Sequence, residues 1–323
     1  MENRWILSIL KLRKNIYEIY QKHSRSAGIL LKGLAAFILF FSINSFYKNV
    51  SGTQMLISVA LALVCAVLPM RMTYLVSAVV VMLNLWHVSW DVVAFYAAAV
   101  LLSYLLVCRI KPDTAIIIAF TPLFFFLKIP FLLPLLVGSM SSLLGVAALA
   151  FGILFYYFGL YSLDVMAFLS SATGGENVIA VKSILDSFMA DKDMLLVVLA
   201  LVVAALVTFV LYHQSFDYAW YVGIAAGGLA GFIVYLAGGI LYDIENGSMV
   251  YIFTIPIAIV IGFAVQFFRC IIDYSGVEKL EFEDDEYYYY VKAVPKVNVI
   301  VDDFAVVESI KEKTAKKEED KQI

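Results

Sequence analysis

Long runs of hydrophobic residues, separated by short polar breaks, occupy the chain from Ala27 to Arg269. A helix needs about 20 apolar residues to cross the hydrocarbon core of a bilayer, and roughly 17 to 25 is the usual range. By this criterion the pattern predicts seven clear membrane spans. They cover residues 27–47, 54–70, 72–88, 92–108, 195–212, 218–241 and 248–268.

The stretch from Thr114 to Leu163 is harder to divide, because its single charged residue is Lys128. It is too long for two ordinary spans and short for three. We expect three segments, which brings the total to about ten transmembrane helices. They cover residues 113–128, 129–143 and 144–163. The middle segment would rise only about 20 Å as a helix, so a re-entrant segment there, with nine spans in all, is the alternative.

The distribution of basic residues favours ten spans over nine. Lys and Arg near span ends prefer the cytoplasmic side, whereas acidic residues carry little weight. With ten spans, every arginine of the chain and the lysines of the tail lie on the cytoplasmic side. With nine spans, Arg269 and the tail would have to be translocated. We therefore expect both termini in the cytoplasm of a multi-pass protein of the cell membrane.

Composition supports a membrane protein and excludes a soluble globular domain. Hydrophobic residues make up 63% of the chain and the mean hydropathy is +0.91, and a soluble domain of 323 residues could not bury so much apolar surface. The expected fold is all-α and polytopic. Its regions are an amphipathic interfacial helix over 1–26, a helix bundle over 27–269 and a soluble cytoplasmic tail over 270–323.

The two ends of the chain carry opposite charge. Seven Lys or Arg against two Glu up to Lys32 give the N-terminal region a net charge of +5. Apolar residues recur there at helical spacing between the basic ones, which is typical of a helix in the lipid headgroup plane. The tail from Cys270 has eight Lys against fourteen acidic residues, a net charge of −6.

Glycines at four-residue intervals mark one face of the span 218–241. Gly223, Gly227 and Gly231 allow another helix backbone to approach closely, and van der Waals contact drives helix association in lipid. We expect this face to pack within the chain, with a homo-oligomer interface as the alternative.

Ionisable residues inside a membrane are the default functional candidates, and this chain has few of them. Lys128, in the proline-rich stretch, is one candidate, although its stem could also extend to the membrane surface. His87 and Asp91 are four residues apart and would form a proton-relay pair on a shared helical face, or else belong to a solvated turn.

No motif for catalysis, cofactor or metal binding occurs. The chain has three histidines without an HExxH arrangement, single cysteines, and neither a Walker A nor a GxSxG sequence. We therefore expect no enzyme activity, no cofactor and no nucleic-acid partner. The partners that we expect are the lipid bilayer and a protein at the tail.

Two further segments carry hydrophobic periodicity. The outer loop 164–194 predicts two short amphipathic helices around residues 173–175, which would cap the bundle or cover a binding cavity. In the tail, β-branched and aromatic residues predict strands over 287–291 and 297–301, joined as a hairpin near 293–296. The acidic run before them suggests a docking surface for a protein partner, with a self-packed unit as the alternative. Its candidate residues are Asp284, Asp285, Tyr288 and Tyr290.

The tail segment 282–296, which reads FEDDEYYYYVKAVPK, resembles the C-terminal tail of uncharacterised multi-pass proteins of clostridia-type Gram-positive bacteria. Some of these proteins are loosely labelled transporter permeases. The resemblance covers the tail and the general pattern of spans, and it implies a bacterial membrane without naming a substrate.

Three functions follow as hypotheses. The first is a membrane scaffold or permease-like subunit whose cytoplasmic tail docks a partner. The second is a self-contained secondary transporter with its path through the proline-rich region, because transporters use broken helices and glycine-lined contacts. The third, an intramembrane enzyme, lacks any acid–base or nucleophile constellation.

Overall fold

A computed structural model describes residues 24–47, 52–171, 180–215, 218–242, 248–269, 278–283 and 288–293. The expected interfacial helix over 1–26 lies almost entirely outside these residues. The chain divides into two compact units, Met1–Gln266 and Phe267–Ile323.

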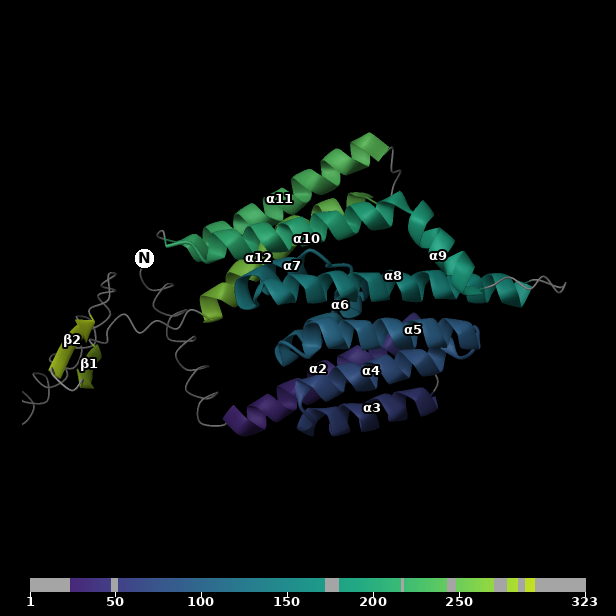
Figure 1. Ribbon diagram of the computed structural model, residues 1–323, viewed down its shortest axis with the longest axis horizontal. Coiled ribbons are helices and arrows are strands. Elements are labelled where there is room, and N and C mark those ends of the chain that lie inside the picture. The colour runs from purple at the N-terminus through teal and green to yellow at the C-terminus, as the bar shows by residue number, and fades with distance from the viewer. Residues whose placement is uncertain are drawn as a thin grey trace, which may run out of the picture. The chain divides into compact units, whose positions relative to one another are not determined.

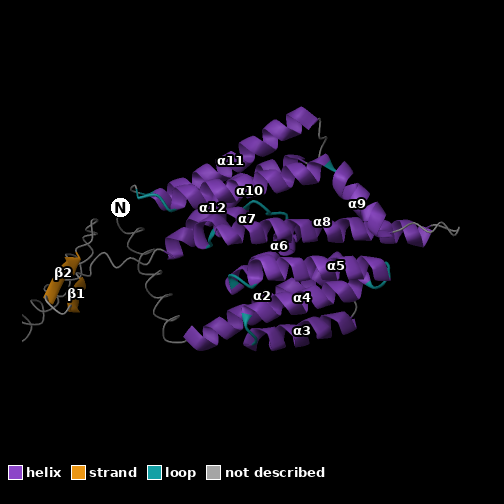
Figure 2. Ribbon diagram, viewed as in Figure 1, coloured by secondary structure: helices purple, strands orange, loops and turns teal. Residues whose placement is uncertain are grey.

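The first unit is a bundle of helices joined mostly by short connections (Figure 2). Its elements are α2 (Ser24–Phe46), α3 (Gly52–Val67), α4 (Met70–Leu85), α5 (Trp90–Ser103), the π-helix η1 (Tyr104–Cys108), the 3₁₀ turn η2 (Pro112–Thr114), α6 (Ala115–Phe126), α7 (Leu132–Met140), α8 (Leu143–Ser171), α9 (Ala180–Ala190), α10 (Lys192–Tyr212), α11 (Ala219–Tyr242) and α12 (Ser248–Arg269).

Five helices among the described residues are long and apolar enough to cross a membrane, by length and composition. Four more apolar helices are shorter, between 10 and 17 residues. Many of their large hydrophobic side chains point outward, among them Leu63 at 68% and Val67 at 79% exposure. Only lipid can cover such a surface without cost. The chain is thus an all-α membrane protein, as the sequence predicts.

Helix starts follow local capping chemistry. Ser89 accepts a hydrogen bond from the Val92 amide at 3.3 Å and begins α5. Asp191 begins α10, because its carboxylate accepts hydrogen bonds from the amides of Asp193 and Met194 at 2.9 and 3.1 Å. Both side chains satisfy amides that have no partner inside the helix.

Three groups of helices make up the bundle (Figure 1). Helices α2 to α5 form one group, and α10, α11 and α12 form another. Helices α6, α7 and α8 lie between them. Helix α6 packs against α8 and α4, while α7 packs against α10. The middle group therefore connects the two outer ones.

The stretch 114–163 contains three helices at the expected places, but the middle one is short. Helix α7 has nine residues, which rise about 14 Å, roughly half of the hydrocarbon core. Its side chains are nevertheless almost all buried. Helix α7 is therefore a core element of the bundle and too short for a full crossing.

The segment 164–194 forms only one of its two expected helices as a separate element. Residues 165–169 belong to the end of α8, whose helix continues to Ser171. The second predicted helix is α9, in which Ala180 and Ile184 are buried. Phe188 of α9 packs edge-on against Tyr161 of α8, with ring centroids 5.1 Å apart. Helix α9 thus covers an end of α8.

The glycines of α11 face α10 within the same chain. A Cβ on Gly227 would fall on the Thr208 hydroxyl and 2.8 Å from the Ala204 carbonyl oxygen. A Cβ on Gly223 would lie 2.9 Å from the Tyr212 amide nitrogen, and one on Gly231 would lie 2.9 Å from the Ala204 Cβ. The two backbones are in contact, so this face is occupied inside the protomer.

The second unit contains an antiparallel hairpin, but its strands differ from those expected. Strand β1 (Glu278–Glu283) pairs with β2 (Tyr288–Ala293). The expected strand 287–291 therefore overlaps β2. Its partner is β1, which precedes it in the sequence, whereas the expected partner 297–301 follows it. The expected turn at 293–296 is wrong, since the connection covers residues 284–287. The other expected strand, 297–301, lies outside the described residues.

The close contact of α10 and α11 predicts that a larger side chain at Gly227 strongly destabilises the protein. Gly227→Leu should lower the free energy of unfolding by about 3 kcal/mol or more, because the side chain must displace backbone. Thermal unfolding of the purified protein in detergent measures this change. Gly239→Leu on the same helix is the control, since nothing lies within 4 Å of its added Cβ. Equal melting temperatures for both variants would mean that the packing does not stabilise the bundle.

Candidate functional site

A small cavity lies inside the bundle, between the end of α2 and helices α4, α5, α6 and α8. Its volume is about 60 Å³. Hydroxyl groups from four of these helices and from the residue after α2 line it. They belong to Ser42, Tyr47, Tyr74, Ser77, Tyr96 and Tyr156.

The tyrosine hydroxyls differ in their partners. Tyr74 shares a hydrogen bond of 2.7 Å with Ser103. Among the described residues, Tyr47, Tyr96 and Tyr156 make no hydrogen bond through their hydroxyls. Each of these three residues lines the cavity, and a tyrosine hydroxyl can both donate and accept a hydrogen bond. The cavity is therefore suited to a guest that can form hydrogen bonds.

Serine hydroxyls near the cavity are already paired with helix carbonyls. Ser42 donates to the Ile38 carbonyl and Ser77 to the Tyr74 carbonyl, both at 2.7 Å. Each hydroxyl oxygen can still accept a hydrogen bond from a guest. The serines thus contribute acceptors, while the unpaired tyrosines contribute donors as well.

A proline changes the backbone on the α6 side. Pro122 lies inside α6 and lines the cavity, as does Ile118, one turn earlier. Proline has no amide hydrogen, so the Ile118 carbonyl loses its usual donor from position 122. In lipid such a carbonyl needs another partner. The proline therefore adds hydrogen-bonding capacity to this wall.

Aromatic packing holds the tyrosine rings in place. Phe125 of α6 stacks on Tyr156 of α8 at 4.3 Å between centroids. Tyr96 of α5 packs against Phe155 of α8 at 5.3 Å. On α8, Gly159 leaves room for Tyr47, whose hydroxyl would lie 3.1 Å from a Cβ at that position. The cavity is consequently a preformed site.

The size and charge of the cavity restrict what it can hold. About 10 to 15 Å³ of such volume accommodates one water, so the space admits a few waters or a solute of similar size. No ionised side chain is among its lining residues. Among the described residues, its lining can therefore bind a small guest through hydrogen bonds to hydroxyl groups.

Lys128 lies outside this cavity and caps a helix. It is exposed and has a positive φ of 59°. Its amide donates to the Phe125 carbonyl at 3.0 Å, and the Ile129 amide donates to the Phe124 carbonyl at 2.9 Å. These two bonds form a Schellman motif, in which glycine is the usual residue at the left-handed position. The backbone of Lys128 thus ends α6.

His87 and Asp91 do not share a helix. His87 lies in the turn after α4, while Asp91 lies in the first turn of α5, with the N-cap Ser89 between them. Both side chains are exposed. The solvated-turn interpretation fits this geometry, and a proton relay along one helical face does not. Asp91 also lies where a negative charge favours a helix start.

The docking candidates of the tail can be placed only by backbone register. Tyr288 pairs with Glu283 and Tyr290 with Glu281, whereas Asp284 and Asp285 lie outside the described residues. The register thus sets each of the two tyrosines opposite a glutamate.

A polar contact outside the cavity was also not predicted from the sequence. The Tyr161 hydroxyl donates to the Asp191 carboxylate at 2.6 Å, which joins α8 to the start of α10. No group of three or more His, Cys, Asp or Glu in the described part of the chain could hold a metal. Cys65 and Cys108 are buried as free thiols.

Sequence reasoning missed the cavity because it looked for charged residues in the spans. A usable signal was present, since Tyr74, Tyr96 and Tyr156 are hydroxyl-bearing residues within otherwise apolar segments. Their spacing in sequence, however, does not show that they meet.

Comparison with known proteins identifies no relative. No family model, no curated protein and no solved structure matches this chain.

Proposed function

We propose that this chain is a permease-like membrane subunit, in which the hydroxyl-lined cavity is the site for a small uncharged solute and the tail docks a cytoplasmic partner. The cavity between α6 and its neighbours is the observation that carries the proposal. The path of the chain around the cavity and the charges at the ends of the bundle support it.

Contacts along α8 give the direction of α6. Gly145 of α8 lies beside Ile117 of α6, and seven residues later Gly152 lies beside Thr121. Positions increase together in both helices, so α6 and α8 run parallel. Helix α6 is followed by the capped turn at Lys128 and then by α7.

Helix α7 runs back toward the end of the bundle where α6 starts. Phe131, just before α7, lies beside Gly231, which also contacts the region of Ala200 and Ala204 in α10. Gly138, near the end of α7, lies against Ala205 and Thr208. Helix α7 therefore runs parallel to α10. Because α10 is antiparallel to α8 and α6 is parallel to α8, α7 is antiparallel to α6. Together α6 and α7 form a re-entrant hairpin.

This path gives eight crossings and one re-entrant hairpin in place of ten crossings. The crossings are α2, α3, α4, α5 with η1, α8, α10, α11 and α12. A hairpin that starts and ends on one side of the membrane adds no net crossing. The helices after α7 therefore have the same orientation as they would have with ten crossings. Both termini therefore stay on the same side, as the charge distribution requires.

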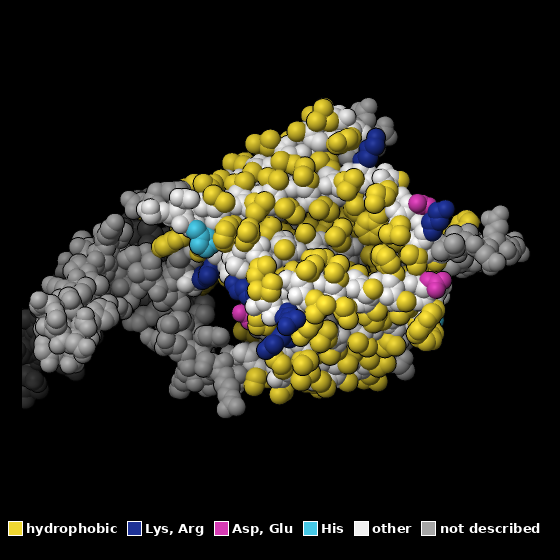
Figure 3. Space-filling model, in the orientation of Figure 1, with side chains coloured by type: hydrophobic (Ala, Val, Ile, Leu, Met, Phe, Trp, Pro, Cys, Tyr) yellow, Lys and Arg dark blue, Asp and Glu magenta, His cyan; other side chains and the backbone are white. Residues whose placement is uncertain are grey.

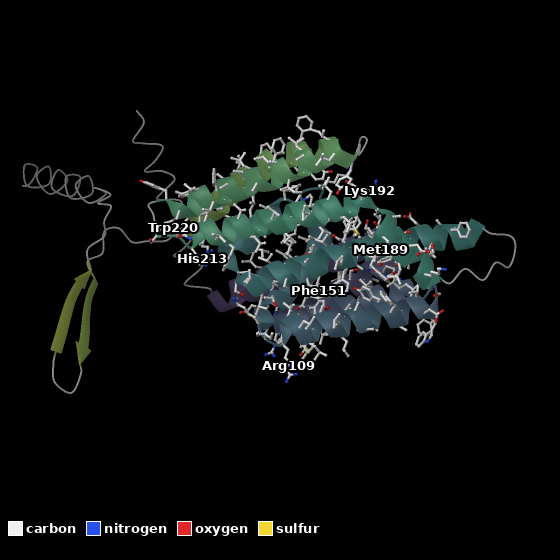
Figure 4. All side chains as sticks on the ribbon, turned by 45° about the horizontal axis from the view of Figure 1, so that its top comes forward. Arg109, Phe151, Met189, Lys192, His213 and Trp220 are labelled. Carbon is white, nitrogen blue, oxygen red and sulfur yellow. The ribbon has the colours of Figure 1, made fainter. Side chains whose placement is uncertain are left out.

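The charges at the two ends of the bundle point to the cytoplasmic side. Side chains at the two ends of the helices include His213 at one end and Lys192 at the other (Figure 4). On the face shown in Figure 3, hydrophobic side chains cover the area between the ends. The end of the bundle where α2 starts and α5 ends is mainly basic, with Lys32, Arg71, Arg109, Lys111 and Asp113. The opposite end is mainly acidic, with Asp91, Asp164, Asp186, Asp191, Asp193, Lys182 and Lys192.

The positive-inside rule places the first of these ends in the cytoplasm. The Tyr212 side chain there contacts Gln266 near the end of α12 through a hydrogen bond of 3.1 Å. The polypeptide beyond α12 then begins on the cytoplasmic side, which agrees with the expected location of the tail.

The cavity suits a neutral solute better than an ion. A bare charge in a low-dielectric site needs a countercharge or several strong ligands. The polar side-chain groups of the described lining are all hydroxyls. Small hydroxylic or amide-bearing solutes can pair with these groups. A broken helix beside the site is also a recurrent feature of transporters.

The tail hairpin supports a docking role. An isolated two-stranded hairpin is at best marginally stable in water, and a third strand or a packed helix is usually needed. In the described part of the tail, β1 and β2 pair only with each other. An extended segment of a partner could add to either edge through backbone hydrogen bonds.

Topology gives the first test of this proposal. A reporter active only in the cytoplasm should be active after Ile323 and inactive within residues 174–177, since an even number of crossings lies before the tail. Reporters active only outside should show the reverse pattern. A tail reporter active only outside would mean an odd number of crossings and would contradict the hairpin of α6 and α7.

Solute flux tests the cavity. Proteoliposomes made with the full chain should take up small neutral solutes such as urea or glycerol faster than empty liposomes, as measured by stopped-flow light scattering. Ala119→Leu, which fills the cavity, should abolish the excess flux. Tyr96→Phe should lower it about threefold to tenfold, the effect of losing one hydrogen bond.

Ala94→Leu is the matched control for flux, because Ala94 of α5 is exposed and does not line the cavity. It should transport like the wild type. Excess flux that persists in a folded Ala119→Leu variant would exclude the cavity as the path. No excess flux in the wild type would favour a scaffold without transport.

Partner capture tests the tail. Deletion of residues 271–323 should leave a folded bundle that loses its co-purifying proteins. Reversal of charge at Asp284 and Asp285 should weaken capture and reduce its sensitivity to salt if the partner surface is basic. Lys182→Glu on exposed α9 is the control and should change nothing. Unaltered capture by the truncated chain would contradict docking by the tail.

A further inference from the structure

A second, larger hollow lies on the side of the bundle, between α3 and α4. Helix α3 packs extensively on α2 but barely touches α4, which leaves a groove with a volume of about 830 Å³. This volume is in the range of pockets that hold drug-sized ligands, roughly 300 to 1,000 Å³. The groove is separate from the tyrosine-lined cavity, and their lining residues do not overlap.

The groove is apolar along most of its length and polar at one end. Its apolar wall includes Ile57 and Leu61 of α3 and Leu75, Val79 and Leu83 of α4. The polar group comes from the end of α2, the start of α3 and the end of α4, which lie at the same end of the bundle. Its members are Asn44, Gln54, Asn84 and His87.

The polar end is built into the structure. Asn44 is 5% exposed and donates through its amide to the Ser58 hydroxyl at 2.8 Å. Asn84 is 9% exposed and donates to the Val80 carbonyl at 3.0 Å. A carboxamide has two N–H groups, so the bond from Asn44 to Ser58 uses only one of them. Two amides are therefore held in fixed orientations beside an apolar channel.

Two tryptophans indicate the depth of this end in the membrane. Trp86 lines the groove, and its ring lies 4.8 Å from that of Trp90 in an edge-to-face contact. The two side chains are 59% and 63% exposed. Exposed tryptophans are enriched at the level of the lipid headgroups. The polar end therefore lies at headgroup level, and the apolar part extends into the hydrocarbon core.

We propose that the groove binds one phospholipid, with an acyl chain between α3 and α4 and the phosphate at Asn44, Asn84 and His87. The described lining residues include hydrogen-bond donors and an imidazole, and none of them is a carboxylate, which matches an anionic phosphate. An apolar protein helix would match the channel but leave the polar end without a partner. The proposal requires only that the bundle spans the membrane and holds whether or not the cavity transports a solute.

Photocrosslinking of lipids tests the site. The full chain is placed in nanodiscs that contain phosphatidylglycerol with a diazirine in one acyl chain, and adducts are mapped by mass spectrometry. Adducts should concentrate on the facing sides of α3 and α4. Val79→Trp should fill the groove, where Val79 is 52% exposed, and lower these adducts about fivefold or more. Leu101→Trp on α5, 61% exposed and outside the groove, should not.

A second arm separates headgroup recognition from mere filling by acyl chains. Diacylglycerol with the same diazirine chain lacks the phosphate and should give several-fold fewer adducts than phosphatidylglycerol. His87→Ala should reduce the difference between the two lipids. Equal labelling by both lipids would overturn the phosphate site. Equal adducts in the Val79→Trp and Leu101→Trp variants, or a dimer that excludes lipid from α3 and α4, would overturn the proposal as a whole.

Discussion

Satisfaction of the backbone within lipid is the constraint on which this architecture depends. Water is absent from the hydrocarbon core, so every peptide group there must find a partner inside the protein. The turn between α6 and α7 shows how the chain meets this demand. After α6, the hydrogen bonds from the Lys128 and Ile129 amides close the helix end, and the following residues lead into α7, most of whose residues are buried. The irregular backbone after α6 is thus satisfied by local hydrogen bonds, although the side chains of Leu127 and Lys128 are exposed.

Small residues make the close packing possible. The contact of α10 with α11 brings Gly227 against Thr208 and Ala204, and α7 reaches the same region of α10 through Gly138. In lipid, such contacts replace the hydrophobic effect as the source of helix association. One stretch of α10 therefore packs against both α11 and α7, which connects the middle group of helices to the group of α10, α11 and α12. The tyrosine-lined cavity lies on the other side of α6 and α8, where aromatic rings leave space between them.

Helix positions were predictable from the sequence because spans and breaks differ strongly in polarity. Seven expected spans and the three segments of 114–163 coincide with helices in the structure. Whether 129–143 crosses the membrane was not predictable in the same way. The hydropathy of α7 is like that of a span, and only its length and its packing partners distinguish it from one. Likewise, hydroxyls from several helices meet in the cavity through tertiary packing. The pairing of the tail strands failed for a related reason, since strand content does not specify which neighbour is the partner.

The shortness of α7 has a consequence for how the protein is made. A segment of nine residues cannot hold itself across a membrane, and its main packing partner, α10, is synthesised later. Translation at about 5 to 20 residues per second separates Met140 from Tyr212 by roughly 4 to 14 s. During that interval α7 must remain beside the insertion machinery or on α8. Assembly of the bundle is therefore completed late, when α10 emerges and receives α7.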